Sequence, residues 1–222
     1  YLSGSAIVGG ITTNTSGTSN FIAGVNAGNS ITSGGNYNTV VGDEAGTAIT
    51  TGDDNTSVGY RAGYTLTTGT NNVLIGGNAG DAITTGTDNV ALGRASLTSD
   101  TLGQSSVAIG HQALFSQNFT SATNAYNVAV GKNAGLALST GTNNTLIGGL
   151  AGDANTTASN NTAVGYASLG ANTTGTSNVA LGAYALDANT TASNNTAIGR
   201  GALTANTTGT QNTAVGSFSL DA

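Results

Sequence analysis

The sequence lacks proline, cysteine, methionine and tryptophan, and it carries few charges. Only 6% of its 222 residues are charged, whereas about a quarter are charged in a typical soluble domain. Without cysteine the chain has no disulfide framework, no thiolate nucleophile and no thiolate metal ligand. Its four Lys and Arg residues, in a chain of net charge −6, cannot neutralise many phosphates, so we expect no nucleic-acid partner.

Long apolar segments are missing as well. No run approaches the roughly 20 residues that span a membrane, and no signal peptide is recognisable, so we expect no membrane insertion by this segment. The first residue is Tyr1 rather than Met, which predicts a mature or excised segment. Disordered chains combine high net charge with few β-branched residues, whereas this chain is rich in Thr, Val and Ile, so we expect it to fold.

A five-residue phrase ending in glycine recurs along the whole chain. It reads NTSVG at 55–59, NVLIG at 72–76 and NVALG at 89–93. Nine of the twelve steps between these anchor glycines are 17 residues long, and the others are 15, 18 and 21. The thirteen anchor glycines are Gly9, Gly24, Gly42, Gly59, Gly76, Gly93, Gly110, Gly131, Gly148, Gly165, Gly182, Gly199 and Gly216.

This repeat predicts an all-β fold, a parallel β-solenoid of about thirteen coils forming one domain over residues 1–222. A 17-residue unit is too short for a helix–turn–helix repeat and is poor in helix formers. It has room for two strands of about five residues and two turns. Coils stacked at about 4.8 Å would form a rod roughly 60 Å long. Both ends of the chain fall within a coil, so we expect flanking sequence or end-to-end stacking of copies.

Two neighbouring positions of the phrase are apolar. The residue directly before the anchor glycine is Val, Ile, Leu or Ala in all repeats, and the one before that is aliphatic or Ala except at Ser57. Successive strand residues point to opposite faces, so one column lines the coil and the other points outward. A long outward apolar column predicts packing against another copy, a homo-oligomer. The alternative is a monomer that tolerates a mostly Ala outer column.

Asparagine lies four residues before the anchor glycine in eleven repeats, and Ser5 and Ser106 replace it in the other two. Stacked amides hydrogen-bond from coil to coil, which predicts a structural ladder. A turn residue in the left-handed conformation is the alternative, and neither gives the column a chemical role. The predicted ladder contains Asn55, Asn72, Asn89, Asn127, Asn144, Asn161, Asn178, Asn195 and Asn212.

The half-coil after the anchor trades volume between two positions. Where Gly stands four residues after the anchor, an aliphatic residue stands seven after it. Where Leu stands four residues after the anchor, a polar residue stands seven after it. A narrow core at normal density has room for one large group there. The coil with Gly152 and Asn155 breaks the rule, and we expect Leu150 to fill its space. The pairs are Gly28/Ile31, Gly46/Ile49, Gly63/Leu66, Gly80/Ile83, Gly135/Leu138, Leu97/Asp100, Leu114/Gln117, Leu169/Asn172, Leu186/Asn189 and Leu203/Asn206.

One coil breaks the period with a four-residue insertion within 111–130. It contains Phe115, Phe119 and Tyr126, a concentration of aromatic residues in a chain where they make up 5%. Insertions in repeat proteins map to loops, often on a binding face, so these three residues form the candidate binding site. The alternative, which we favour, is a loop whose aromatic side chains fold back to cover the solenoid or a subunit seam.

The residues of catalysis and metal binding are sparse. His111 is the only histidine, and with no cysteine and no second histidine it makes no zinc site and no catalytic triad. The carboxylates of Asp43–Glu44 and Asp53–Asp54 diverge as neighbours on a strand do, so neither pair suits acid–base catalysis. A calcium site at Asp53–Asp54 is the weaker alternative, because calcium needs six to eight oxygens. We therefore expect no enzyme activity, no metal and no cofactor.

The phrase N-T-A-V-G-x-x-A-L-x-A-N-T-T-G-T-x-N is clearest at Asn161–Asn178, Asn178–Asn195 and Asn195–Asn212, and covers nearly the whole chain in variants. It closely resembles the YadA-like and haemagglutinin-like head repeats of trimeric autotransporter adhesins. It is also similar to the shaft repeats of some phage tail fibres. The resemblance implies a left-handed parallel β-roll, three chains about one axis and a cell-surface or virion location. The best-known coil of this family is shorter, so these coils would carry an enlarged turn.

The sequence therefore predicts a structural extracellular fibre or adhesin segment that extends from a surface and mediates attachment to an unknown host or matrix receptor. Two alternatives stay open. One is a self-stacking filament subunit, and the other is an ice-binding protein that uses stacked Thr-x-Thr columns such as Thr68–Thr70 and Thr85–Thr87.

Overall fold

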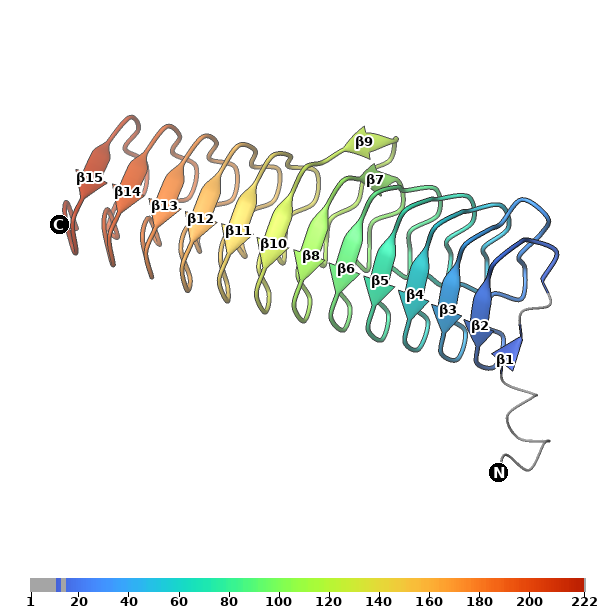
Figure 1. The fold of residues 1–222 in the computed structure, drawn as a ribbon. Coiled ribbons are helices and arrows are strands. Elements are labelled where there is room, and N and C mark those ends of the chain that lie inside the picture. Colours follow the sequence, from blue (N-terminus) through green and yellow to red (C-terminus); the bar gives the residue numbers. More distant parts are fainter. Residues whose placement is uncertain (1–10, 13–14, 222) are drawn as a thin grey trace, which may run out of the picture.

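The structure is a computed structural model that describes residues 11–12 and 15–221. It is an all-β rod in which each coil adds one parallel strand to a single long sheet (Figure 1). Its strands are β1 Ile11–Thr12, β2 Phe21–Ala23, β3 Thr39–Val41, β4 Thr56–Val58, β5 Val73–Ile75, β6 Val90–Leu92, β8 Val107–Ile109, β10 Val128–Val130, β11 Thr145–Ile147, β12 Thr162–Val164, β13 Val179–Leu181, β14 Thr196–Ile198 and β15 Thr213–Val215.

The solenoid prediction is confirmed, with about 17 residues per turn. Of the thirteen strands in the sheet, β1 runs antiparallel to β2 and the other twelve are parallel, which makes about eleven full turns rather than thirteen coils. The first anchor, Gly9, lies outside the described residues. Register is kept from coil to coil, so that Leu146 pairs with Ala163 and Ala163 with Ala180.

The expectation of two five-residue strands per coil is wrong. From β2 onward each coil has one three-residue strand in the long sheet, and the return half consists of turns and bends apart from the two-residue strands β7 (Gly103–Gln104) and β9 (Thr123–Asn124) in two neighbouring coils. Hydrogen bonds still join the return halves: the Gly63 N–H donates to the Ala79 carbonyl at 3.0 Å, for example. The second and fourth residues after each anchor are left-handed, as at Ala95 (φ 54°) and Leu97 (φ 51°). Extended backbone cannot pass through two such residues, so the segment directly after the anchor forms no strand.

The anchor glycines are required for two reasons. Their φ values lie between +129° and +141°, a region that side chains rarely enter. They also stack directly on one another: a Cβ on Gly42 would lie 2.6 Å from the carbonyl oxygen of Gly59. A side chain at an anchor would therefore push neighbouring coils apart.

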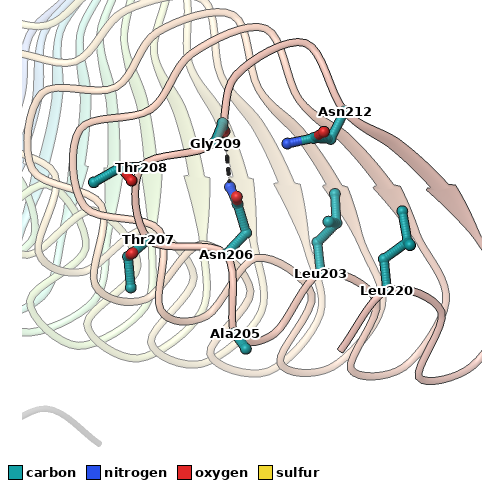
Figure 2. A pocket seen from close by; sticks show the side chains of 8 residues that line it. All are labelled: Leu203, Ala205, Asn206, Thr207, Thr208, Gly209, Asn212 and Leu220. Carbon is teal, nitrogen blue, oxygen red and sulfur yellow. Dashed lines mark hydrogen bonds between the residues drawn. The ribbon is translucent and has the colours of Figure 1, made fainter. Parts of the chain in front are cut away.

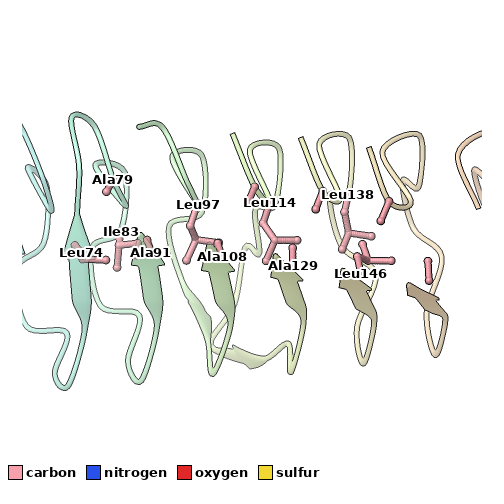
Figure 3. Close-up of a cluster of buried hydrophobic side chains, with 14 of the residues drawn as sticks. Leu74, Ala79, Ile83, Ala91, Leu97, Ala108, Leu114, Ala129, Leu138 and Leu146 are labelled. Carbon is pink, nitrogen blue, oxygen red and sulfur yellow. The ribbon is translucent and has the colours of Figure 1, made fainter. Parts of the chain in front are cut away.

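The core is a thin apolar layer between the sheet and the return half (Figure 3). The middle residue of each strand points inward and faces the residue four places after the anchor, so that a Cβ on Gly80 would lie 2.7 Å from Leu74 Cδ2. The same Cβ would lie 2.9 Å from Ile83 Cδ1, which explains the volume trade: glycine in the fourth place leaves space for the aliphatic residue in the seventh. Every coil with Leu in the fourth place has Ala mid-strand, as Leu97 has Ala91.

The coil that breaks the rule is filled from the strand. Leu146 is fully buried, and a Cβ on Gly152 would lie 2.8 Å from Leu146 Cδ2. Leu150 lies on the outer turn and is only half-buried. The expectation that Leu150 fills this space is therefore wrong.

Ser57 gives a direct test of this core. Its side chain is fully buried in the mid-strand column between Val40 and Leu74, and its hydroxyl has no hydrogen-bond partner. Removing an unsatisfied buried hydroxyl recovers its desolvation cost, so Ser57→Ala should raise the free energy of unfolding by about 1 kcal/mol. Thermal unfolding measures this, with the exposed Thr85→Ala as control. A destabilised Ser57→Ala protein would contradict the assigned packing.

Candidate functional site

The outer face of the sheet is the most extended apolar surface of the rod. The first and third residues of each strand point outward: the first is mostly Thr or Val, and the third is mostly Val, Ile or Leu. Leu92 is 42% exposed, Leu181 45% and Val215 68%. The Ala-rich column lies inside, so the alternative of a mostly Ala outer column is wrong. A continuous apolar strip of this kind is typical of a protein interaction surface.

The asparagine column lies directly before each strand and links each coil to the next. The Asn144 N–H donates to Asn127 Oδ1 at 2.9 Å, and the Asn161 N–H donates to Asn144 Oδ1 at 3.1 Å. The Asn144 side-chain amide also donates to the Ala158 carbonyl at 2.9 Å. Each buried amide thus connects the next coil to the return half of its own coil, which is a structural role.

We expect Asn144→Ala to lower the free energy of unfolding by about 2 kcal/mol. The substitution leaves the Asn161 N–H and the Ala158 carbonyl without partners in a buried place. Thr157→Ala, at an exposed position, is the control. Chemical denaturation measures both variants, and equal stabilities would contradict a ladder that holds the coils together.

The ladder is rebuilt where Ser106 replaces asparagine. Gln117, from the return half of the same coil, accepts a hydrogen bond from Asn127 Nδ2 of the next coil at 2.9 Å and donates to Ser106 Oγ at 2.9 Å. It also donates to Asp100 Oδ2 at 2.6 Å. All four side chains are fully buried. Sequence analysis did not find this network, although a serine in the asparagine column beside two polar residues at core positions was its signal.

Asp100 links this network to the insertion. Its Oδ1 accepts the N–H groups of Gly103 at 2.9 Å and Phe119 at 3.2 Å. Burial raises the pKa of the Asp100 carboxyl above its ordinary value, although hydrogen bonds from Gln117, Gly103 and Phe119 partly oppose the shift. An ionised carboxylate with only neutral partners is therefore costly here. Through the Phe119 N–H, Asp100 contacts the coil that carries the insertion.

This shift predicts a pH dependence of stability. The unfolded Asp100 carboxyl has an ordinary pKa of about 3.9, so the folded chain binds this proton more tightly. Stability gained by protonation is present at low pH and is lost as pH rises through the folded pKa. Asp100→Asn cannot ionise, so its melting temperature relative to wild type should rise as the pH increases above about 4. A constant or falling difference in calorimetry would contradict the shift.

The structure does not bring the three predicted aromatic residues together. Phe119 is buried at 6% exposure, which agrees with the fold-back alternative for that ring. Phe115 is half-buried five residues after its anchor, whereas Tyr126 is 57% exposed five residues before the next. Apart from Tyr126, the exposed residues of segment 115–126 are small or polar: Asn118, Thr120, Ser121, Ala122 and Asn124. The insertion projects from the row of coils, where β9 (Thr123–Asn124) pairs in parallel with β7 (Gly103–Gln104) (Figure 1).

The carboxylate pairs have separate, local partners. Asp53 accepts the Asn36 N–H at 2.6 Å, and Glu44 forms an ion pair with Arg61 at 3.5 Å. Within the described residues, no three His, Asp or Glu side chains gather as a metal site would require, and no helix is long and apolar enough to cross a membrane. Comparison with protein families, curated proteins and solved structures finds no match to the chain.

A pocket of about 320 Å³ lies at the first described coil and one of about 300 Å³ at the last. The one at the last coil is lined by Leu203, Asn206 and Leu220, among others (Figure 2). The Asn206 amide is bound to the Gly209 carbonyl at 3.0 Å. Both pockets lie at the ends of the described part of the thin core, and their residues have the same structural roles as their counterparts along the rod.

Proposed function

We propose that the chain is a structural segment of an extracellular fibre or adhesin that assembles as a homo-oligomer through the outer face of its sheet. The observation that carries this proposal is the outward column of Val, Ile and Leu, including Leu92, Ile147 and Leu181. Burying such an apolar column against another protein surface is favourable, whereas leaving it exposed to water is not. The trimer, the left-handed roll and the surface location come from the resemblance to trimeric adhesin head repeats.

A second copy of the same chain is the natural partner for this face. From β3 onward each coil presents an outward Val, Ile or Leu beside a Thr or Val at the strand spacing of about 4.8 Å, so a parallel copy in register meets like residues along the sheet. Rotational symmetry closes such an assembly at a fixed number of chains.

Mass in solution tests this proposal. We expect sedimentation to give a closed oligomer, and Leu92→Lys/Leu181→Lys to shift it towards monomer because each lysine places a charge in the interface. Thr157→Lys/Thr174→Lys, which adds the same charge on another face, is the control. A wild-type monomer at micromolar concentration would overturn the proposal, and open-ended polymers would favour the filament alternative.

Ice binding is the second candidate, because one threonine column is free. Threonines eight residues after the anchor donate to the next coil, as Thr67 does to the Thr84 carbonyl at 3.0 Å. The threonines one place later are exposed, and their hydroxyls make no hydrogen bond within the described chain. Thermal hysteresis with ice shaping would support this candidate. The column contains Thr51, Thr68, Thr85, Thr140, Thr157, Thr174, Thr191 and Thr208.

A further inference from the structure

The positive charges of the chain are confined to one edge of the rod. All four Lys and Arg residues, and the only histidine, lie one or two residues after an anchor glycine. We call these two positions, in every coil, the turn row; it follows the end of each sheet strand. The members with a basic side chain are Arg61, Arg94, His111, Lys132 and Arg200.

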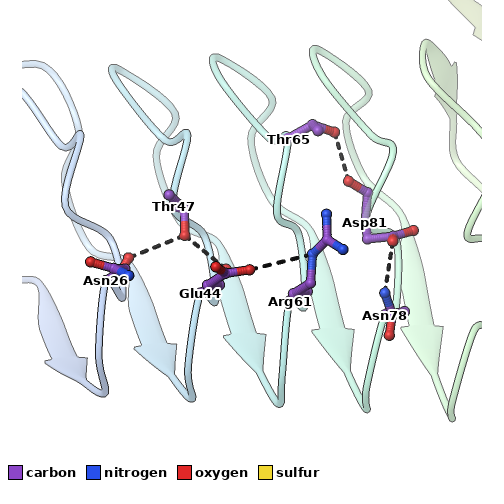
Figure 4. A network of polar contacts seen from close by, with 7 residues as sticks. All are labelled: Asn26, Glu44, Thr47, Arg61, Thr65, Asn78 and Asp81. Carbon is purple, nitrogen blue, oxygen red and sulfur yellow. Dashed lines mark hydrogen bonds and ion pairs between the residues drawn. The ribbon is translucent and has the colours of Figure 1, made fainter.

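Carboxylates are almost excluded from the same edge. Asp43 and Glu44 are its only acidic residues, and from Gly59 onward the turn row contains none, although the chain has ten. Arg61 uses Glu44 as its partner, and this is the only salt bridge in the described part of the chain (Figure 4). Asp81, which lies beside the row, is already engaged by Asn78 at 2.9 Å.

The centre of the row is a stack of three basic side chains. Arg94, His111 and Lys132 follow strands β6, β8 and β10, which pair in register, so they lie on successive coils at about the strand spacing of 4.8 Å. Arg94 Nη1 is 3.1 Å from His111 Nε2, and Arg94 and Lys132 are exposed. The fold does not need them, because Gly77 and Gly149 occupy the same place in the flanking coils.

Exposed aromatic rings continue the row towards β15. Tyr166 and Tyr184 are 51% and 40% exposed, and their rings meet edge to face at 5.5 Å. Two coils after Tyr166, the Arg200 guanidinium lies 5.0 Å from the centre of the Phe218 ring. Unpaired cations beside exposed tyrosine rings offer charge-assisted hydrogen bonds and flat apolar faces on the same edge.

We infer that the turn row binds a linear anionic polysaccharide lying along the rod. Sulfate or carboxylate groups bind Arg94, His111 and Lys132, and the apolar faces of sugar rings pack on Tyr166 and Tyr184. An anion on this stack offsets the charges of Arg94 and Lys132, neither of which forms an ion pair with a carboxylate within the described residues. Nucleic acid fits less well, because four cations in a chain of net charge −6 cannot neutralise a phosphate at every nucleotide. The inference gives the adhesive role proposed above a ligand class, at a face distinct from the oligomer interface.

Calorimetry at low salt, with heparin as the sulfated probe and neutral dextran as its uncharged counterpart, tests the inference. We expect heparin to bind, dextran not to bind, and added salt to weaken heparin binding. Arg94→Gln/Lys132→Gln should lower the heparin affinity at least about tenfold, because it removes two charge-assisted contacts. Tyr166→Ala should lower it less, through the lost packing of one ring.

The matched control is Asn143→Asp/Asn160→Asp, which makes the chain more negative by the same two charges at another corner. Asp54 and Asp88 occupy that position in other coils with the same left-handed backbone, so the control should fold. It should keep most of its heparin affinity. No heparin binding, an equal loss in both double variants, or equal binding of single-stranded DNA would overturn the inference. A monomeric protein that still binds heparin would contradict only the proposed oligomer.

Discussion

The close stacking of each coil on the next is the constraint on which the rest of the structure depends. At about 4.8 Å between strands, each side chain has the equivalent residue of the next coil as its nearest neighbour. A position is therefore acceptable only if its residue tolerates a copy of itself. Glycine, alanine, threonine and asparagine do, and the buried asparagines use the copy as a hydrogen-bond partner. Like charges repel at this spacing, which accounts for the low charge of the chain.

Features that repeat were predictable from the sequence, because a period shows directly which residues share an environment. The coil length and the parallel stacking follow from the anchor glycines alone. The inward column did not follow, because alternation leaves two solutions that are equal in pattern. Packing across the core decides between them: Leu97 and Leu169 need Ala91 and Ala163 opposite, and the bulkier residues then face outward.

Other features escaped prediction for local reasons. The return half has a strand-like composition, yet residues such as Ala95 and Leu97 adopt left-handed backbone that propensity does not anticipate. The network of Asp100, Ser106 and Gln117 occurs at one place along the rod only, so it leaves no repeating pattern in the sequence. The grouping of Arg94, His111 and Lys132 was visible in the sequence, but it gains meaning once the register places them on successive coils.

The direction of the hydrogen bonds between coils has a mechanical consequence. These bonds run along the rod axis, so tension on the ends loads the coils in series and opens them one at a time, and the weakest coil sets the breaking force. Where Ser106 interrupts the asparagine ladder, this load passes through the hydrogen bonds of Gln117 to Ser106 and Asn127. Chains associated along the sheet face would bear the tension in parallel at every coil. The assembly would then resist a force that opens the coils of a single chain one at a time.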